Sequence, residues 1–175
     1  MVSRFTKYQK RQDVIIRALA LIDEEVPIQF TFVGDGPTKN DMISLAKQLG
    51  VENCIQFVPF LEQNKLWSLI SKQDVLCHAC DYEGLSKIIL ETMGLGIPVL
   101  VSDVLPLNDY IQDQKNGYLS KNTPEAWATA ISELWYSKNK LKTIGAKGTA
   151  FVHKNYNAKK NCKLYEQEFI QLLNN

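Results

Sequence analysis

Two carboxylates mark the stretch of this sequence that is best suited to chemistry. Glu83 lies in a polar stretch, and Glu91 follows eight residues later inside a run that is otherwise apolar. Because a buried carboxylate is unfavourable without hydrogen-bond donors, Glu91 needs partners. One interpretation is an ion pair with Lys87, one helical turn earlier, on a partly solvated face. The other is that Glu91 points into a cleft and, together with Glu83, accepts hydrogen bonds from the hydroxyl groups of a ligand.

The residues around these carboxylates predict a strand, a loop, a helix and a second strand. The expected elements are a strand over Asp74–His78, a loop over Asp81–Leu85, a helix from Ser86 to about Leu95, and a strand over Ile97–Val101. Ser86 is a favourable N-cap, and the β-branched second strand is typical of a buried parallel sheet. In such a βαβ unit the loop follows the carboxyl end of a strand, where open α/β sheets bind ligands.

The start of the predicted helix suits an anion. Gly84 precedes it, and the backbone N–H groups of Leu85, Ser86 and Lys87 have no partner within the first turn. Unpaired N–H groups at a helix start attract negative charge. We therefore expect these four residues to contribute to a ligand site.

Two cations lie in a loop near the start of the chain. Arg4 and Lys10 flank this loop, which separates the end of an expected first strand from a helix over Arg11 to Glu24. On charge alone, a solvated basic loop is the simpler interpretation. A βα loop at the carboxyl edge of the sheet would instead face the same cleft as Glu83, where two cations could neutralise a diphosphate.

A glycine-rich turn follows the next expected strand, Ile28–Val33. The sequence Gly34-Asp35-Gly36-Pro37 is too short for a dinucleotide-binding fingerprint. Both a simple sharp turn and a close approach to a ligand remain open for it. A further strand is expected over Cys54–Val58.

The block EGLSKIILETMGLGIPV, followed by Ser102-Asp103, resembles the signature of family 4 retaining glycosyltransferases, which have the two-domain GT-B fold. The resemblance runs from Val2 to about Gly117 and more loosely to the end. It implies that residues 1–175 form the C-terminal domain, which binds the nucleotide-sugar donor, and that the N-terminal acceptor domain is absent. We accordingly expect a chain that starts within a longer protein and transfers no sugar alone.

The resemblance also implies roles for individual residues. Arg4 and Lys10 have the spacing of the family's pyrophosphate-binding pair, although Ser3 and Arg11 stand where the family has glycine. Glu91 would bind the ribose and Glu83 the donor sugar. Gly34 belongs to a turn that the family shares, and Val58 and Phe60 would form an apolar shelf for the base. For Val58 and Phe60, ordinary core packing is the alternative.

Composition narrows the class of protein. The chain has 175 residues, 45% hydrophobic and 22% charged, with a net charge of +1, so we expect no nucleic-acid partner. It shows neither a signal peptide nor an apolar run of transmembrane length, which favours a cytoplasmic protein with at most peripheral contact at the inner membrane face. The Cys77–Cys80 pair and the isolated His78 and His153 are interpreted as structural.

The remaining pattern alternates helices with strands. Further helices are expected over Thr38–Leu49, Leu66–Ile70, Thr123–Tyr136, Leu141–Val152 and Asn157–Leu173, with a short strand at Tyr118–Leu119. Together these elements predict an α/β fold, a Rossmann-like three-layer sandwich with a central parallel sheet of about five or six strands.

The resulting hypothesis is a retaining transferase that moves a hexosyl group from a UDP- or GDP-sugar to a glycan or lipid acceptor, in bacterial capsule, lipopolysaccharide or glycolipid synthesis. Because no Asp-x-Asp motif is present, we expect no metal and no cofactor. Two alternatives stay open. One is a non-catalytic nucleotide-binding α/β module such as a receiver domain, although Ser3-Arg4 replaces the acidic residues that a receiver needs. The other is a relative of the phosphorylases or glycogen synthases.

Overall fold

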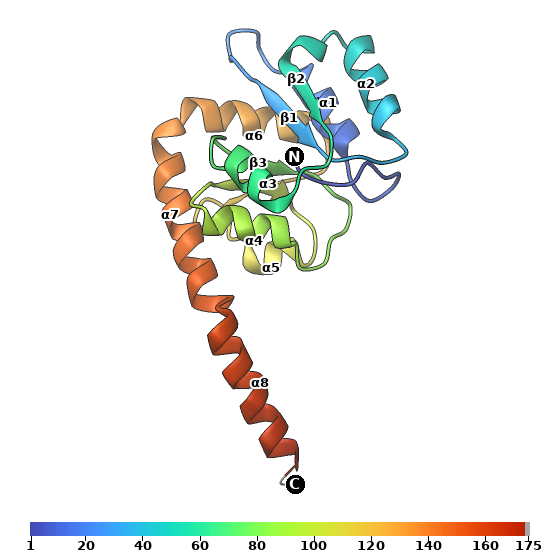
Figure 1. Cartoon of the computed structure of the whole chain (residues 1–175). Coiled ribbons are helices and arrows are strands. Elements are labelled where there is room, and N and C mark those ends of the chain that lie inside the picture. The colour runs from blue at the N-terminus through green and yellow to red at the C-terminus, as the bar shows by residue number, and fades with distance from the viewer. Residues whose placement is uncertain (174–175) are drawn as a thin grey trace.

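Parallel strands form the centre of the fold in the computed structural model, which describes residues 1–173 (Figure 1). The strands are β1 (Phe30–Val33), β2 (Ile55–Val58), β3 (Leu76–His78), β4 (Val99–Ser102) and β5 (Tyr118–Ser120). β1 pairs with β2, and β3, β4 and β5 pair in that order, all in parallel. Each of these five strands was predicted, within a few residues of its ends, whereas the expected first strand before Arg4 is present only as an isolated bridge at Val2.

The expected single sheet is present as two hydrogen-bonded groups within the described residues. The first segment of the chain pairs with β1 only at an isolated bridge, Val2 to Val33, where the Ser3 N–H donates to the Val33 carbonyl at 3.0 Å. Both groups nevertheless share one apolar core, because Phe32 of β1, Cys77 of β3 and Leu100 of β4 belong to the same buried cluster. Packing of side chains joins the two groups into one domain.

Helices lie between and around the strands. They are α1 (Gln12–Leu19), α2 (Lys39–Gln48), α3 (Gln63–Ile70), α4 (Lys87–Gly94), α5 (Leu107–Tyr110), α6 (Pro124–Tyr136), α7 (Lys138–Asn155) and α8 (Ala158–Leu173), with a 3₁₀ turn over Glu52–Cys54. The prediction that the first helix continues to Glu24 was wrong. The chain turns after Leu19, and the Asp23 carboxylate accepts the Glu25 N–H locally, which competes with continuation of the helix.

Alternating residues of β3 and β4 face two helical layers. Cys77 and Leu100 lie in the cluster that contains Ile15 of α1 and Trp127 of α6. Their neighbours Leu76, Val99 and Val101 lie in a second cluster with residues of α4 and α5. Because successive residues of a strand point to opposite faces, one short strand contributes to both layers. The predicted three-layer arrangement is confirmed.

The long helix α7 begins earlier than predicted and contains two glycines that serve its packing. A Cβ atom on Gly145 would lie 2.0 Å from the backbone oxygen of Gly96, so only glycine lets α7 approach the turn after α4 this closely. The preceding helix, α6, starts as predicted, with Pro124 at its first position and the Thr123 side chain accepting the Ala126 N–H.

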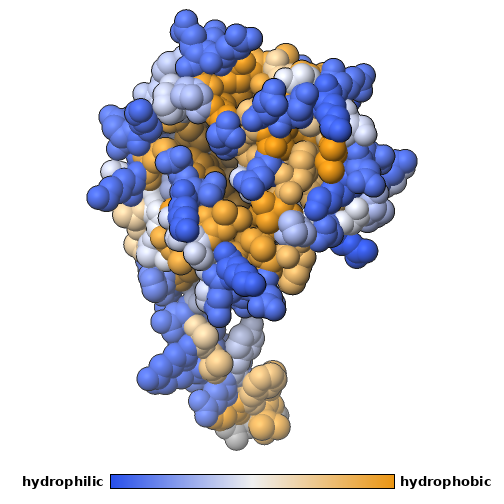
Figure 2. Space-filling model, turned by 45° about the horizontal axis from the view of Figure 1, so that its top comes forward, coloured by the Kyte–Doolittle hydropathy of each residue, from blue (hydrophilic) through white to orange (hydrophobic). Residues whose placement is uncertain are grey.

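Helix α8 extends away from the rest of the domain (Figure 1). Its apolar side chains are exposed, among them Tyr165, Phe169 and Leu172, and Figure 2 shows hydrophobic surface at the end of this arm. Among the described residues, no helix combines the length and the apolar character needed to cross a bilayer.

Two glycines after β1 bring the loop that carries Arg4 against the sheet. Gly34 and Gly36 have φ values of 137° and 155°. A Cβ atom on Gly34 would lie 2.2 Å from the Ser3 carbonyl oxygen, and one on Gly36 would lie 2.2 Å from the Phe5 carbonyl oxygen. The turn at Gly34–Pro37 therefore holds the Ser3–Phe5 segment in place.

We predict that Gly34→Ala destabilises the domain by about 1–3 kcal/mol, because the new Cβ meets backbone atoms in a φ region unfavourable to alanine. Gly94→Ala is the matched control, since Gly94 is exposed and a Cβ there meets nothing within 4 Å. Denaturant unfolding measures both variants. Equal stability of Gly34→Ala and the unmodified chain would show that the Ser3–Phe5 segment is not held by this close approach.

Candidate functional site

A backbone bridge brings the early basic loop to the end of β3. Lys10 and Cys80 form an isolated antiparallel bridge. On either side of it, the Arg11 N–H donates to the Ala79 carbonyl at 3.0 Å and the Asp81 N–H donates to the Gln9 carbonyl at 2.9 Å. The two loops at the carboxyl edge of the sheet are thereby fastened together, as the βα topology predicts.

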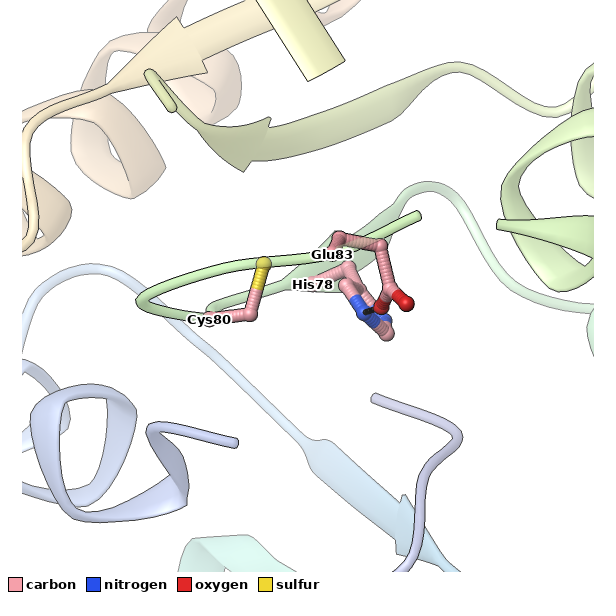
Figure 3. Close-up of side chains that lie close together, drawn as sticks. All are labelled: His78, Cys80 and Glu83. Atoms are coloured by element: carbon pink, nitrogen blue, oxygen red, sulfur yellow. Dashed lines mark hydrogen bonds and ion pairs between the residues drawn. The ribbon is translucent and has the colours of Figure 1, made fainter. Parts of the chain in front are cut away.

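Lys10, His78 and Glu83 meet beside this bridge. The Lys10 ammonium forms an ion pair with the Glu83 carboxylate, and both side chains are largely buried, with exposed fractions of 12% and 14%. The His78 Nε2 lies 2.9 Å from the same carboxylate oxygen, Oε2, and 3.3 Å from the Lys10 Nζ. Figure 3 shows the His78 ring and the Glu83 carboxylate side by side at the end of β3. Two of the predicted site residues are therefore in direct contact.

Charge and burial set the protonation of this cluster. Burial alone would raise the pKa of Glu83, but hydrogen bonds from His78 and Lys10 and the positive charge of Lys10 lower it to about 2. For His78, burial lowers the pKa, and the adjacent Lys10 adds to this lowering against the opposing effect of Glu83. Glu83 is therefore a carboxylate, which only accepts hydrogen bonds, so the His78 Nε2 carries the hydrogen and donates it.

The ends of β4 and β5 hold the loop that follows β3. The Ser102 hydroxyl accepts the Cys80 N–H at 2.9 Å, and the Asn122 amide donates to the Cys80 carbonyl at 2.6 Å. Arg11 reaches the Asp81 carboxylate at 2.9 Å. Arg11, which stands in place of a family glycine, therefore leaves the bridge between the loops intact and adds an ion pair to it.

Glu91 has different partners from those that the first interpretation gave it. Its carboxylate accepts hydrogen bonds from the Trp67 indole at 3.0 Å and from the Gln63 amide at 3.2 Å, both on α3. No bond to Lys87 is present among the described residues. Glu91 is half-buried and held in position from the neighbouring helix, while a carboxylate keeps further capacity to accept hydrogen bonds.

The start of α4 has the geometry expected for a helix N-terminus. Gly84, Leu85 and Lys87 are exposed, whereas Ser86 is buried. Ser86 occupies the N-cap position as predicted, and its hydroxyl makes no capping hydrogen bond. The Ser86 side chain therefore does not occupy the N–H groups of the first turn.

Arg4, Gly34 and Phe60 line one pocket of about 550 Å³, together with Leu66 of α3. Arg4 is exposed and forms no ion pair within residues 1–173. Phe60 is 75% exposed, so packing in the core does not explain it. Val58 does not line the pocket, and its carbonyl accepts the Gly34 N–H at 3.0 Å. Phe60 therefore lines an apolar pocket, whereas Val58 does not.

Asp35 organises this pocket and was not predicted. Its carboxylate accepts the Phe60 N–H at 2.7 Å and pairs with Lys39 at 2.8 Å. The Lys39 hydrogen bond and, secondarily, the Phe60 N–H lower the pKa of Asp35. An aspartate between two glycines was visible in the sequence, with Lys39 four residues later, but the Phe60 N–H comes from another segment.

A second cavity, of about 370 Å³, lies at the amino ends of β1 and β3, lined in part by Ile28, Gln73 and Trp135. None of the predicted site residues lines this cavity. Its walls are mainly apolar side chains.

His78, Cys80 and Glu83 have potential metal-ligand atoms within 4.8 Å of one another (Figure 3). The Lys10 ammonium, however, already contacts the same Glu83 oxygen and lies beside the same His78 nitrogen. Burial also raises the pKa of the Cys80 thiol to about 11, which keeps it in the protonated form that binds metals poorly. These residues do not fit a metal ion.

Solved structures with the same fold include glycosyl transferases. The structure of Anabaena Alr3699/HepE in complex with UDP and glucose superposes with a TM-score of 0.84 at 20% identity, covering 97% of this chain and 48% of that one. The C-terminal domain of a glycosyl transferase group 1 family protein, LpcC of Francisella tularensis, superposes with a TM-score of 0.80 at 22% identity, covering 90% and 85%. The fold is therefore that of the Rossmann-like C-terminal domain of a GT-B protein.

The sequence assigns the family. Residues 1–151 match the family described as glycosyl transferases group 1, and this chain belongs to it. An uncharacterized glycosyltransferase of Methanocaldococcus jannaschii is 31% identical over 76% of this chain and 34% of its own length. N-acetyl-alpha-D-glucosaminyl L-malate synthase of Bacillus anthracis is 25% identical over 98% of this chain and 45% of its own length. The chain thus spans less than half the length of these curated relatives.

The low pKa of Glu83 predicts how the cluster responds to acid. A carboxyl group whose pKa is lower in the folded chain stabilises it above the unfolded value, near 4.5, and this contribution disappears as the pH falls through about 2. Near neutral pH, we expect Glu83→Gln to lower the free energy of unfolding by about 1–3 kcal/mol. The difference from the unmodified chain should shrink as the pH falls across that window.

Denaturant unfolding over a series of pH values checks this prediction. The control is Glu168→Gln, which changes an exposed carboxylate on α8. A loss of stability in Glu83→Gln that stays constant down to pH 2 would mean that the ionised carboxylate does not stabilise the fold.

Proposed function

We propose that this chain is the donor-binding half of a retaining glycosyltransferase of family 4, which moves a hexosyl group from a UDP- or GDP-sugar to a glycan or lipid acceptor. The proposal rests on one observation, which is that the carboxyl edge of the sheet brings Lys10 into contact with Glu83. Arg4 lies on the same basic loop, in the adjacent pocket. Cations suit a diphosphate and carboxylates suit hydroxyl groups.

Each part of the donor has a place at this edge. Arg4, Lys10 and the N–H groups of Leu85, Ser86 and Lys87 bind the diphosphate and stabilise the charge that develops on it as the sugar departs. Gly84 lets the backbone approach, and Glu83 accepts hydrogen bonds from the donor sugar. Glu91 binds the ribose hydroxyls. Phe60, with the backbone at Val58 and Gly34, forms the wall against the base.

Named relatives support this class of substrate. A GDP-mannose-dependent phosphatidylinositol monomannoside mannosyltransferase of Mycolicibacterium smegmatis is 28% identical over 80% of this chain and 39% of its own length. An O-antigen biosynthesis glycosyltransferase of Escherichia coli is 27% identical over 91% of this chain and 43% of its own length. We therefore place the reaction in the synthesis of capsule, lipopolysaccharide or glycolipid.

The proposal includes a second domain. The chain covers less than half of its relatives, and α8 exposes an apolar stripe that the rest of the domain does not cover. We infer that an N-terminal domain supplies the acceptor site, and that residues 1–175 alone bind donor but transfer no sugar. We place the protein in the cytoplasm, with at most peripheral contact with the inner membrane. Since Lys10 occupies the candidate ligand atoms, we expect no metal requirement.

Calorimetric titration of the chain with UDP, GDP, UDP-glucose and GDP-mannose tests the proposal. The variants are then titrated with the ligands of whichever base binds. Glu91→Gln should weaken binding of the nucleoside diphosphate and of the nucleotide-sugar alike, because both contain ribose. Glu83→Gln should leave binding of the nucleoside diphosphate intact and weaken binding of the nucleotide-sugar. We expect each affected affinity to fall by about 1.5–3 kcal/mol, the scale of a hydrogen bond to a charged group.

Glu166→Gln on α8 is the control for a general loss of negative charge, and melting curves monitor folding. Absence of any nucleotide binding by the unmodified chain would reject the proposed function. Equal losses for both ligands in both variants would keep the site and reject this division of roles.

A further inference from the structure

One carboxylate oxygen of Glu83 has two donors. Lys10 and His78 both reach Oε2, and the other oxygen, Oε1, accepts the Gly84 N–H at 3.2 Å. Lys10 neutralises the carboxylate, whereas His78 is a neutral donor. The proposed function assigns Lys10 to the diphosphate and Glu83 to the sugar. In the structure, these two residues are paired with each other.

A diphosphate would change this balance. Its negative charge competes with Glu83 for the Lys10 ammonium, and an ammonium that turns toward the phosphates gives up part of its interaction with the carboxylate. Glu83 would then carry an uncompensated charge beside an anionic ligand. A donor that stays with Glu83 while Lys10 turns away would keep the carboxylate in place.

We propose that His78 is this donor, a positioning residue that holds Glu83 toward the sugar when the diphosphate takes Lys10. His78 is suited to the role because it cannot follow the ligand. It is the last residue of β3, it pairs with Val101 of β4, and it is 1% exposed. As a neutral group it also competes little for the diphosphate.

The ring has no other hydrogen bond that explains its burial. The Nδ1 atom of His78 is buried and makes no hydrogen bond with any residue that the structure describes. The Nε2–H is the donor and points to Glu83, and it cannot accept a hydrogen from Lys10 at the same time. The hydrogen bond from Nε2–H to Glu83 is therefore the interaction that accounts for a buried imidazole at this position.

The test compares His78→Leu, which removes the donor, with His78→Gln, whose amide nitrogen can replace Nε2–H. The control is His153→Leu, since His153 is exposed on α7. The probes are UDP with UDP-glucose, or GDP with GDP-mannose, whichever pair the unmodified chain binds. We expect His78→Leu to lower the affinity for the nucleotide-sugar about tenfold or more, and to leave the affinity for the nucleoside diphosphate unchanged. His78→Gln should restore most of the loss, and His153→Leu should change neither affinity.

A double-mutant cycle separates positioning from packing. If His78 acts through Glu83, adding His78→Leu to Glu83→Ala, which removes the acceptor of the Nε2–H altogether, should cause no further loss of nucleotide-sugar affinity. Additive losses, or equal losses for both ligands, would overturn the proposal. So would an unchanged nucleotide-sugar affinity in a folded His78→Leu.

Nuclear magnetic resonance of the histidine nitrogens in the unmodified chain gives an independent reading, should His78→Leu fail to fold. Upon addition of the nucleoside diphosphate, the His78 Nε2–H should remain hydrogen-bonded, and its loss would overturn the proposal. This inference rests on the proposed function, yet the two fail differently. Absent nucleotide binding rejects both, whereas retained binding with an unaffected His78 variant rejects the positioning role alone.

Discussion

The antiparallel bridge between Lys10 and Cys80 is the contact on which the site depends. Without it, the part of the basic loop that carries Lys10 would not be held against the end of β3. Two backbone hydrogen bonds, from Arg11 to Ala79 and from Asp81 to Gln9, fix its register against the end of β3. Backbone hydrogen bonds set this register. The backbone at Lys10 is therefore already ordered, and pairing with Glu83 costs little further backbone conformational entropy.

The ion pair that results has two opposing consequences. Removing two charges from water is costly, and a partly buried pair persists only when further hydrogen bonds satisfy it. Glu83 obtains these from His78 and from its neighbour Gly84. Under the proposed function, the same pair means that an incoming diphosphate would compete with the Glu83 carboxylate for Lys10. Arg4 is exposed and forms no ion pair among the described residues, so a ligand would not have to compete with a carboxylate for it.

Much of the fold could be predicted, because its signals are local. The apolar runs gave the strands, and Thr123 with Pro124 gave the start of α6. The break between the two hydrogen-bonded groups of strands was not predictable, since it depends on how a short first segment packs beside β1. The end of α1 was also missed, because the Asp23 side chain takes a nearby N–H group that helix periodicity does not reveal.

The site shows the same division. Glu83, Lys10 and Arg4 could be selected from residue type and position at strand ends. Their partners could not, because Lys10 and Glu83 are 73 positions apart and Trp67 reaches Glu91 from another helix. His78 was interpreted as structural, since an isolated histidine has no spacing signal. Only the folded arrangement shows that its ring donates to Glu83.

We propose that this edge of the sheet binds a diphosphate through its loop cations, and one titration tests this binding most directly. Calorimetry with UDP and GDP compares the unmodified chain with Arg4→Ala, and with Arg17→Ala as a control for an exposed arginine on α1. The account predicts that Arg4→Ala weakens binding by about 1.5–3 kcal/mol, the scale of a charged hydrogen bond, while Arg17→Ala leaves it unchanged. Equal affinities for Arg4→Ala and the unmodified chain would contradict the account.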